Sequence, residues 1–198
     1  LYGDLDVSTI TDTPNAGKQI HTRLIHRNSF IPVIDEIERL LSEGDQMYVI
    51  CPAIELSETG RNVNDIYRNL SGYFRGRYEV GLLHGQMGSE QKADVQRRFA
   101  EGVIDILVAT TVVEVGIDVH RANIMVIYNA NRFGLSQLHQ LRGRIGRGER
   151  EGNCYLLTDS CEEEAIEKLE ILVNNSNGFD IAYHDLQMRG PGDVMGYR

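Results

Sequence analysis

The sequence has only three cysteines among its 198 residues, and no two of them are spaced as Cys-x-x-Cys. Cys51 and Cys154 lie in apolar, strand-like runs, so we expect buried, reduced thiols of a cytosolic protein rather than disulfides or metal ligands. Metal-ligand spacing is also absent around four of the histidines, His21, His26, His120 and His184. We therefore expect no metal site formed by this chain alone.

Long apolar runs are missing as well. No run approaches the roughly 20 residues that a membrane-spanning helix needs, so we expect no membrane partner. Residues 1–6 contain neither a basic segment nor an apolar segment, and no signal peptide is visible. Because the chain starts with Leu1 rather than Met, we expect it to be a piece of a longer protein.

Positive charge is scarce. The net charge is −9 and the sequence pI is about 5.1, whereas a self-sufficient nucleic-acid-binding domain is usually basic. This balance disfavours a simple nucleic-acid-binding module, although such a non-enzymatic module remains an alternative. Any phosphate site must be local, made by individual arginines and backbone N–H groups.

A phosphate-binding P-loop is also missing. The pair Gly17-Lys18 resembles its end, but Asp12 replaces the first glycine and Gln19 replaces the final Ser or Thr. We find no other segment that fits this motif.

Apolar strand-like runs alternate with amphipathic helical segments. We expect strands at 20–26, 47–51, 80–84, 104–109, 124–128 and 154–157, and helices at 30–41, 63–74, 89–100 and 136–145. Ser29 and Ser89 are candidate N-caps, and Gly44 is a candidate helix stop. This alternation predicts an α/β fold with a parallel sheet covered by helices on both faces, formed by residues 1–160. The tail, residues 161–198, is expected to form a helical hairpin from helices at 162–174 and 179–188.

Small and polar residues follow the predicted strands. Pro52 follows the strand at 47–51, Gly85 and Gln86 follow the strand at 80–84, and residues 110–118 follow the strand at 104–109. Ligands of open parallel sheets bind outside the carboxyl ends of the strands. We therefore expect a binding site at this edge.

Residues 137–148 contain Arg142, Arg144 and Arg147, separated by glycines. Arginine matches phosphate oxygens with two parallel hydrogen bonds, and glycines let the backbone approach a ligand, so this segment fits a polyphosphate. We expect it at the same edge as the other loops. Alternatively, it is a basic helix end followed by a glycine turn.

Two of these segments resemble helicase motifs. Residues 110–118 resemble the fifth motif, and residues 140–147 the sixth, of the second RecA-like lobe of superfamily-two helicases. Three runs, residues 1–8, 131–140 and 189–193, narrow the resemblance to the RecG family of bacterial branch-migration DNA helicases. The resemblance extends over the whole chain, although His120 stands where that family usually has Pro.

The resemblance implies a nucleotide site shared between two lobes, with ATP and Mg²⁺ bound mainly by a first lobe outside this chain. Arg144 and Arg147 would act as arginine fingers, and Gln140 would order their segment or reach the phosphates. The positions that would lie near the nucleotide are Gly116, Asp118, Glu114 and Gly143.

The resemblance further implies branched or duplex DNA as a partner, together with an N-terminal helicase lobe and a wedge domain of the same protein. The residues that would contact DNA are Thr110, Thr111, Gly85, Gln86, Pro52 and Arg189. Residues 161–198 would form part of a translocation motif, and the protein would be a bacterial cytoplasmic enzyme. A duplex translocase of the transcription-repair coupling type is an alternative.

Overall fold

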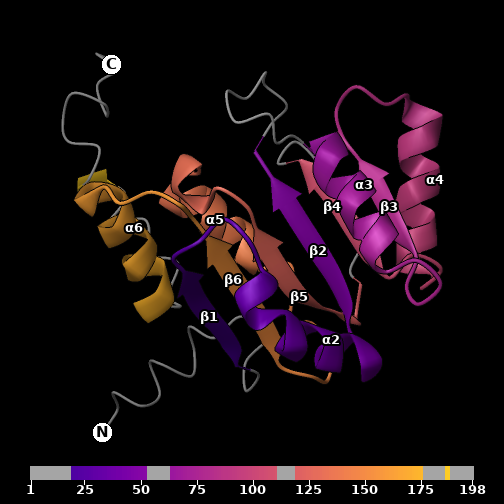
Figure 1. The fold of residues 1–198 in the computed structure, drawn as a ribbon, viewed down its shortest axis with the longest axis horizontal. Coiled ribbons are helices and arrows are strands. Elements are labelled where there is room, and N and C mark those ends of the chain that lie inside the picture. The colour runs from indigo at the N-terminus through magenta and orange to yellow at the C-terminus, as the bar shows by residue number, and fades with distance from the viewer. Residues whose placement is uncertain (1–18, 53–62, 111–118, 176–185, 188–198) are drawn as a thin grey trace, which may run out of the picture.

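A six-stranded sheet forms the centre of the computed structural model, which describes residues 19–52, 63–110, 119–175 and 186–187 (Figure 1). The strands are β1 (Ile20–Ile25), β2 (Gln46–Cys51), β3 (Val80–Leu83), β4 (Ile106–Thr110), β5 (Ala122–Ile127) and β6 (Gly152–Leu157). Their order is β1-β6-β5-β2-β4-β3, and every neighbouring pair is parallel. The predicted parallel α/β fold is confirmed.

Helices cover both faces of this sheet. They are η1 (Ile31–Val33), α2 (Ile34–Ser42), α3 (Val63–Tyr73), α4 (Ser89–Ala100), η2 (Ala130–Arg132), α5 (Leu135–Arg142) and α6 (Glu163–Asn174). Met47 and Val49 of β2 pack in one apolar cluster with α2 and α3, whereas Tyr48 and Ile50 pack in another with α4, α5 and α6. Successive strand residues point to opposite faces, so each strand contributes to two cores.

The three strands at the middle of the sheet are completely buried. Every residue of β2, β4 and β5 is shielded from solvent, which explains why these strands are continuous apolar runs rather than alternating ones. None of the helices within the described ranges is long and apolar enough to cross a membrane.

The predicted helix starts were partly wrong. Ser29 accepts a hydrogen bond from the Ile31 N–H (3.1 Å), but a 3-10 turn follows, and the N-cap of α2 is Val33. Ser89 is the first residue of α4 rather than its cap, which is Gly88. The predicted stop after α2 is confirmed, because Gly44 adopts a left-handed conformation with φ +107°.

Other boundaries differ by two or three residues. Helix α5 ends at Arg142, not at residue 145, and Gly146 downstream has φ +74°, which no right-handed helix contains. Strand β4 begins at Ile106, and β6 begins earlier than predicted, at Gly152. The helix predicted at 162–174 is confirmed as α6, whereas most of the one predicted at 179–188 lies outside the described residues.

Candidate functional site

The carboxyl edge of the sheet brings four of the predicted DNA-contacting positions together. Strand β4 lies between β2 and β3, with Cys51 beside Thr110 and Leu83 beside Ala109. Pro52 follows β2 directly, and Gly85 and Gln86 form the turn after β3. The prediction that these positions share one edge is therefore confirmed, while their contact with DNA remains a prediction.

These positions differ in accessibility. Gly85 and Gln86 are exposed, although the Gln86 N–H donates to Nδ1 of His84 within the turn (3.2 Å). Thr110 is only 2% exposed, and its hydroxyl has no hydrogen-bond partner within the described part of the chain. An unpaired buried hydroxyl is costly, so Thr110 is a polar group that a partner would stabilise.

The arginine segment lies at the opposite, amino edge of the sheet. A Cβ on Gly146 would lie 3.3 Å from the Ile20 side chain at the start of β1, and a Cβ on Gly148 would lie 2.5 Å from the His120 carbonyl oxygen, just before β5. The expectation that this segment joins the loops at the carboxyl edge is wrong. Helix α5 is the reason, because it crosses the sheet from the end of β5 back to the strand starts.

At the amino edge, two arginines stand beside glycine backbone. Arg147 is exposed and its Nε donates to the Gly143 carbonyl oxygen (3.1 Å), while Arg144 is half-buried. Gln140 is exposed on the last turn of α5. A planar guanidinium beside small residues suits a polyphosphate, because it can donate two parallel hydrogen bonds to phosphate oxygens. The donor set therefore fits the phosphates of a nucleotide.

A third arginine of the segment is buried. Arg142 is 4% exposed, and its guanidinium donates to the carbonyl oxygens of Leu172 (2.7 Å) and Asn175 (2.8 Å) and to the Thr22 hydroxyl (3.2 Å). Burial lowers the pKa of Arg142 from its ordinary value. Its role is structural: it joins the end of α5 to the end of α6.

The same guanidinium also contacts His139. Nη2 of Arg142 lies 3.1 Å from Nδ1 of the imidazole, and because a guanidinium can only donate, Nδ1 accepts and His139 is neutral. Burial, and secondly the Arg142 charge, lower the pKa of His139 below 6.5. Protonation of His139 would remove the acceptor of this contact.

Helix α6 is also tied to the start of α5. The Lys168 ammonium donates to the carbonyl oxygens of Asn131 (2.8 Å) and Phe133 (2.7 Å), in the segment that leads into α5. Contacts at both ends of α5 therefore fix α6 against it. The two helices lie side by side in Figure 1.

Arg142 was missed as a structural residue, although the sequence carries a signal for it. Leu135, Leu138 and Arg142 are spaced i, i+3, i+7, the spacing of one helix face. An arginine on an otherwise apolar stripe predicts a buried, paired guanidinium. Gly143, which follows it, is equally typical of a phosphate-binding segment.

Several predicted site residues lie outside the described residues: Thr111, Glu114, Gly116, Asp118 and Arg189. The structure describes the two residues that flank residues 111–118 in the sequence. Thr110 lies at the carboxyl edge, and Val119 lies close to the amino-edge start of β5.

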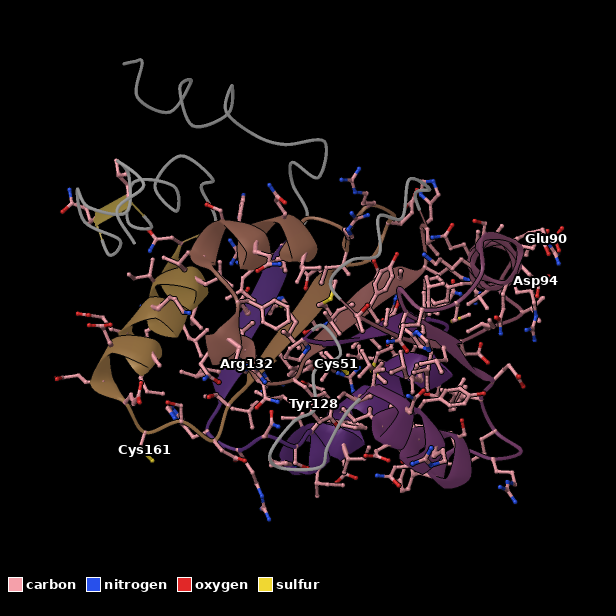
Figure 2. The ribbon with its side chains drawn as sticks, turned by 90° about the horizontal axis from the view of Figure 1, so that it is seen from above. Cys51, Glu90, Asp94, Tyr128, Arg132 and Cys161 are labelled. Atoms are coloured by element: carbon pink, nitrogen blue, oxygen red, sulfur yellow. The ribbon has the colours of Figure 1, made fainter. Side chains whose placement is uncertain are left out.

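The three cysteines differ in burial. Cys51 and Cys154 are buried, and burial raises the pKa of each thiol to about 12, whereas Cys161 lies at the surface (Figure 2). All three are free. Within the described ranges, no three His, Cys, Asp or Glu side chains cluster closely enough to hold a metal ion.

Comparisons with known proteins find similar helicases. The family model described as helicase conserved C-terminal domain matches residues 32–149. The ATP-dependent DNA helicase RecG of Bacillus subtilis (strain 168) is 45% identical over 198 residues, and that of Thermotoga maritima is 44% identical over 200 residues. These alignments cover 99% and 100% of this chain but only 29% and 26% of the relatives. The chain thus corresponds to less than a third of either helicase.

Solved structures give the same result. A structure of RecG bound to a three-way DNA junction matches with a TM-score of 0.77 and 42% identity, over 92% of this chain and 24% of that one. Domain 2 of the DEAD-box helicase Mss116p, bound to an RNA duplex, matches with a TM-score of 0.61 over 80% of this chain and 60% of that one. At 18% identity, the second match shows the shared fold alone. The chain belongs to the helicase conserved C-terminal domain family, and its sheet is the RecA-like lobe of that family.

Proposed function

We propose that this chain is the second motor lobe of a longer, bacterial, cytoplasmic ATP-dependent DNA helicase that acts on branched DNA such as stalled forks and junctions. The observation that carries the proposal is the exposed Arg147 beside Arg144 and glycine backbone, in a chain whose whole length matches RecG helicases at up to 45% identity. The similarity to RecG, an ATP-dependent DNA helicase, and to RecG bound to a three-way DNA junction supports DNA as the partner.

In the proposed reaction, Arg144 and Arg147 act on ATP held mainly by the first lobe. Phosphoryl transfer builds negative charge on the γ-phosphoryl oxygens, and an inserted guanidinium stabilises that charge, with typical rate effects of about 10³–10⁵. Gln140, one turn before them, orders the segment or reaches the phosphates. Gly143, whose carbonyl holds Arg147, lets the backbone approach.

The magnesium ion and the phosphate cradle are assigned to the first lobe, because this sequence has no P-loop and the described residues offer no cluster of metal ligands. We assign Asp118 to the ribose hydroxyl, and Glu114 and Gly116 to neighbouring positions. Nucleotide chemistry is thus completed only where the two lobes meet.

The carboxyl edge is the proposed DNA side of the lobe. Pro52, Thr110 and the turn at Gly85 and Gln86 lie close together there, with the Thr110 hydroxyl unpaired. Together with Thr111, these positions would contact backbone phosphates, and such contacts carry no base information, as a translocase requires. Arg189, in the tail after α6, would help to couple ATP turnover to movement along duplex DNA.

Two measurements test this function. The full-length protein should show ATPase activity that DNA stimulates and should unwind a synthetic three-way junction, whereas the 198-residue chain alone should hydrolyse no ATP. DNA-stimulated ATPase from the chain alone would refute the assignment of the P-loop to another lobe. Displacement of a stalled RNA polymerase without junction unwinding would favour the coupling-type translocase instead.

A further inference from the structure

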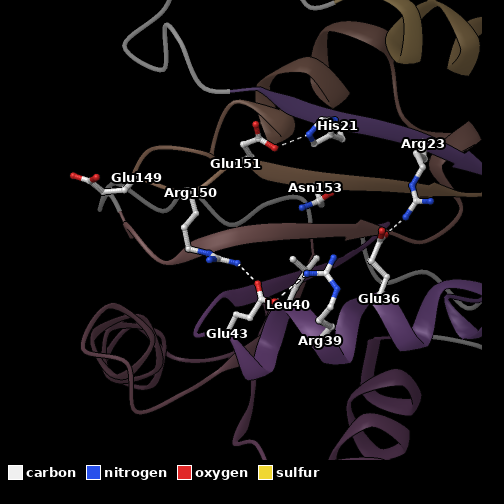
Figure 3. Close-up of a pocket in the computed structure, with 10 residues that line it drawn as sticks. All are labelled: His21, Arg23, Glu36, Arg39, Leu40, Glu43, Glu149, Arg150, Glu151 and Asn153. Carbon is white, nitrogen blue, oxygen red and sulfur yellow. Dashed lines mark hydrogen bonds and ion pairs between the residues drawn. The ribbon is translucent and has the colours of Figure 1, made fainter.

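A mixed-charge groove of about 690 Å³ lies beside the arginine segment, between the starts of β1 and β6 and helix α2 (Figure 3). Arg150, three residues after Arg147, reaches from this side towards Glu43 at the end of α2. The proposed function gives Arg150 no role. Its contacts nevertheless fix the chain directly after the proposed arginine fingers.

Three hydrogen bonds hold Arg150. Its Nε donates to Oδ1 of Asp45 (2.8 Å), and its Nη2 donates to Oδ2 of Asp45 (3.2 Å) and to Oε1 of Glu43 (2.6 Å). The fork is thus bidentate on Asp45, the geometry that constrains a guanidinium most strongly. Both carboxylates, Asp45 first, raise the pKa of Arg150, so the contact stays ionised.

Asp45 is a buried anchor. Its side chain is 1% exposed, compared with 44% for Arg150, and the Asn123 amide donates to its Oδ1 (2.9 Å). A buried carboxylate requires paired partners, since an unpaired one would lose its hydration without compensation. Arg150 supplies the positive charge, so the two residues constrain each other.

The turn around Asp45 is held in place by several hydrogen bonds to other parts of the lobe. The Gln46 side chain donates to the carbonyl oxygens of Phe99 and Ile104, each at 2.8 Å, and the Gln46 N–H donates to the Arg121 carbonyl oxygen at 2.6 Å. The Arg121 guanidinium in turn donates to the Gly44 carbonyl oxygen (3.2 Å). Arg150 is therefore bound to a rigid part of the lobe.

We propose that Arg150 is a positioning residue that fixes the C-terminal end of the arginine segment on Asp45 and Glu43, and so holds Arg144 and Arg147 in the geometry they need. The buried Arg142 fixes the other end of the same segment. The stretch between these two anchors contains Gly143, Gly146 and Gly148 and is intrinsically pliable.

The inference rests on the proposed function, and the test uses the full-length protein. Arg150→Ala should lower the kcat of DNA-stimulated ATP hydrolysis about 10- to 100-fold, because misplacement of a catalytic group by about 1 Å has such effects. KM for ATP and the Kd for junction DNA should stay within about twofold of the wild-type values, as both ligands keep their direct contacts. Arg150→Lys should recover part of kcat, since it keeps the charge but not the fork.

The matched control is Arg97→Ala, which removes an exposed guanidinium that also pairs with two carboxylates, Asp94 and Glu101, but has no contact with the Asp45 turn. It should leave kcat near the wild-type value. The double variant Arg150→Ala/Glu43→Gln should be no slower than Arg150→Ala, because residues that act through one contact are not additive. A purely structural role of Arg150 would lower Tm and leave kcat per folded molecule at the wild-type value.

Two outcomes separate this inference from the proposed function. If Arg147→Ala abolishes ATPase activity while Arg150→Ala keeps the wild-type kcat, the positioning role is refuted and the proposed function stands. If neither variant changes kcat, both are refuted.

Discussion

The Arg142 guanidinium donates to the Leu172 carbonyl oxygen across 2.7 Å, so one buried arginine closes the end of α6 onto the end of α5. Arg142 is also two residues before Arg144, a proposed arginine finger. Only Gly143 separates Arg142 from Arg144, so the proposed arginine finger lies next to a residue that is fixed to the end of α6.

Arg142→Ala should destabilise the lobe strongly. The substitution leaves the Leu172 and Asn175 carbonyl oxygens without their donor, and each unsatisfied buried polar group costs about 1–3 kcal/mol. We expect the free energy of unfolding of the purified chain, measured in urea, to fall by about 2–4 kcal/mol. Arg75→Ala, at an exposed position, serves as the control and should change it by less than about 0.5 kcal/mol. Equal effects of the two substitutions would contradict the role of Arg142.

The Arg142–His139 contact should make stability depend on pH. The folded state lowers the pKa of His139 below 6.5, so the unfolded chain binds a proton more readily. The contribution of neutral His139 is therefore fully present above pH 6.5 and is lost as pH falls through the folded pKa. Between pH 6.5 and about pH 5, Tm should fall further in the wild type than in His139→Gln. Parallel Tm curves for the two proteins would rule this out.

Two glycines should respond oppositely to alanine. A Cβ at Gly148 would lie 2.5 Å from the His120 carbonyl oxygen, which is backbone and cannot rotate away, so Gly148→Ala should cost about 1–3 kcal/mol. A Cβ at Gly72, within α3, would meet nothing within 4 Å, so Gly72→Ala should stabilise by up to about 1 kcal/mol. The free energy of unfolding of both variants, measured in urea, tests these two expectations. A neutral Gly148→Ala would show that the arginine segment does not pack closely against the start of β5.

Much of the fold could be predicted from the sequence, because its signals are local. Fully buried parallel strands are short apolar runs, and β2, β4 and β5 are such runs. Helix starts were less predictable, since a serine does not distinguish a cap from the first helical residue, as Ser89 demonstrates. Pro32 adds a 3-10 turn after Ser29 that helical periodicity does not reveal.

The site was predictable in composition but not in arrangement. The carboxyl ends of β2, β3 and β4 lie side by side at one edge, as the rule for parallel sheets requires. The arginine segment follows a helix rather than a strand, so that rule does not apply to it, and it lies at the amino edge. The carbonyl partners of Arg142 on and after α6 are at least 30 residues away in sequence, and the carboxylate partners of Arg150 at least 105, and only tertiary structure reveals such contacts.

The central claim is that Arg144 and Arg147 complete a nucleotide site on another lobe. The most direct test is the kcat of DNA-stimulated ATP hydrolysis by the full-length protein carrying Arg144→Ala or Arg147→Ala, alongside its Kd for junction DNA. The claim predicts a loss of about 10³-fold or more in kcat for each variant, with Kd within about twofold of the wild-type value. Hydrolysis at the wild-type rate by both variants would contradict it.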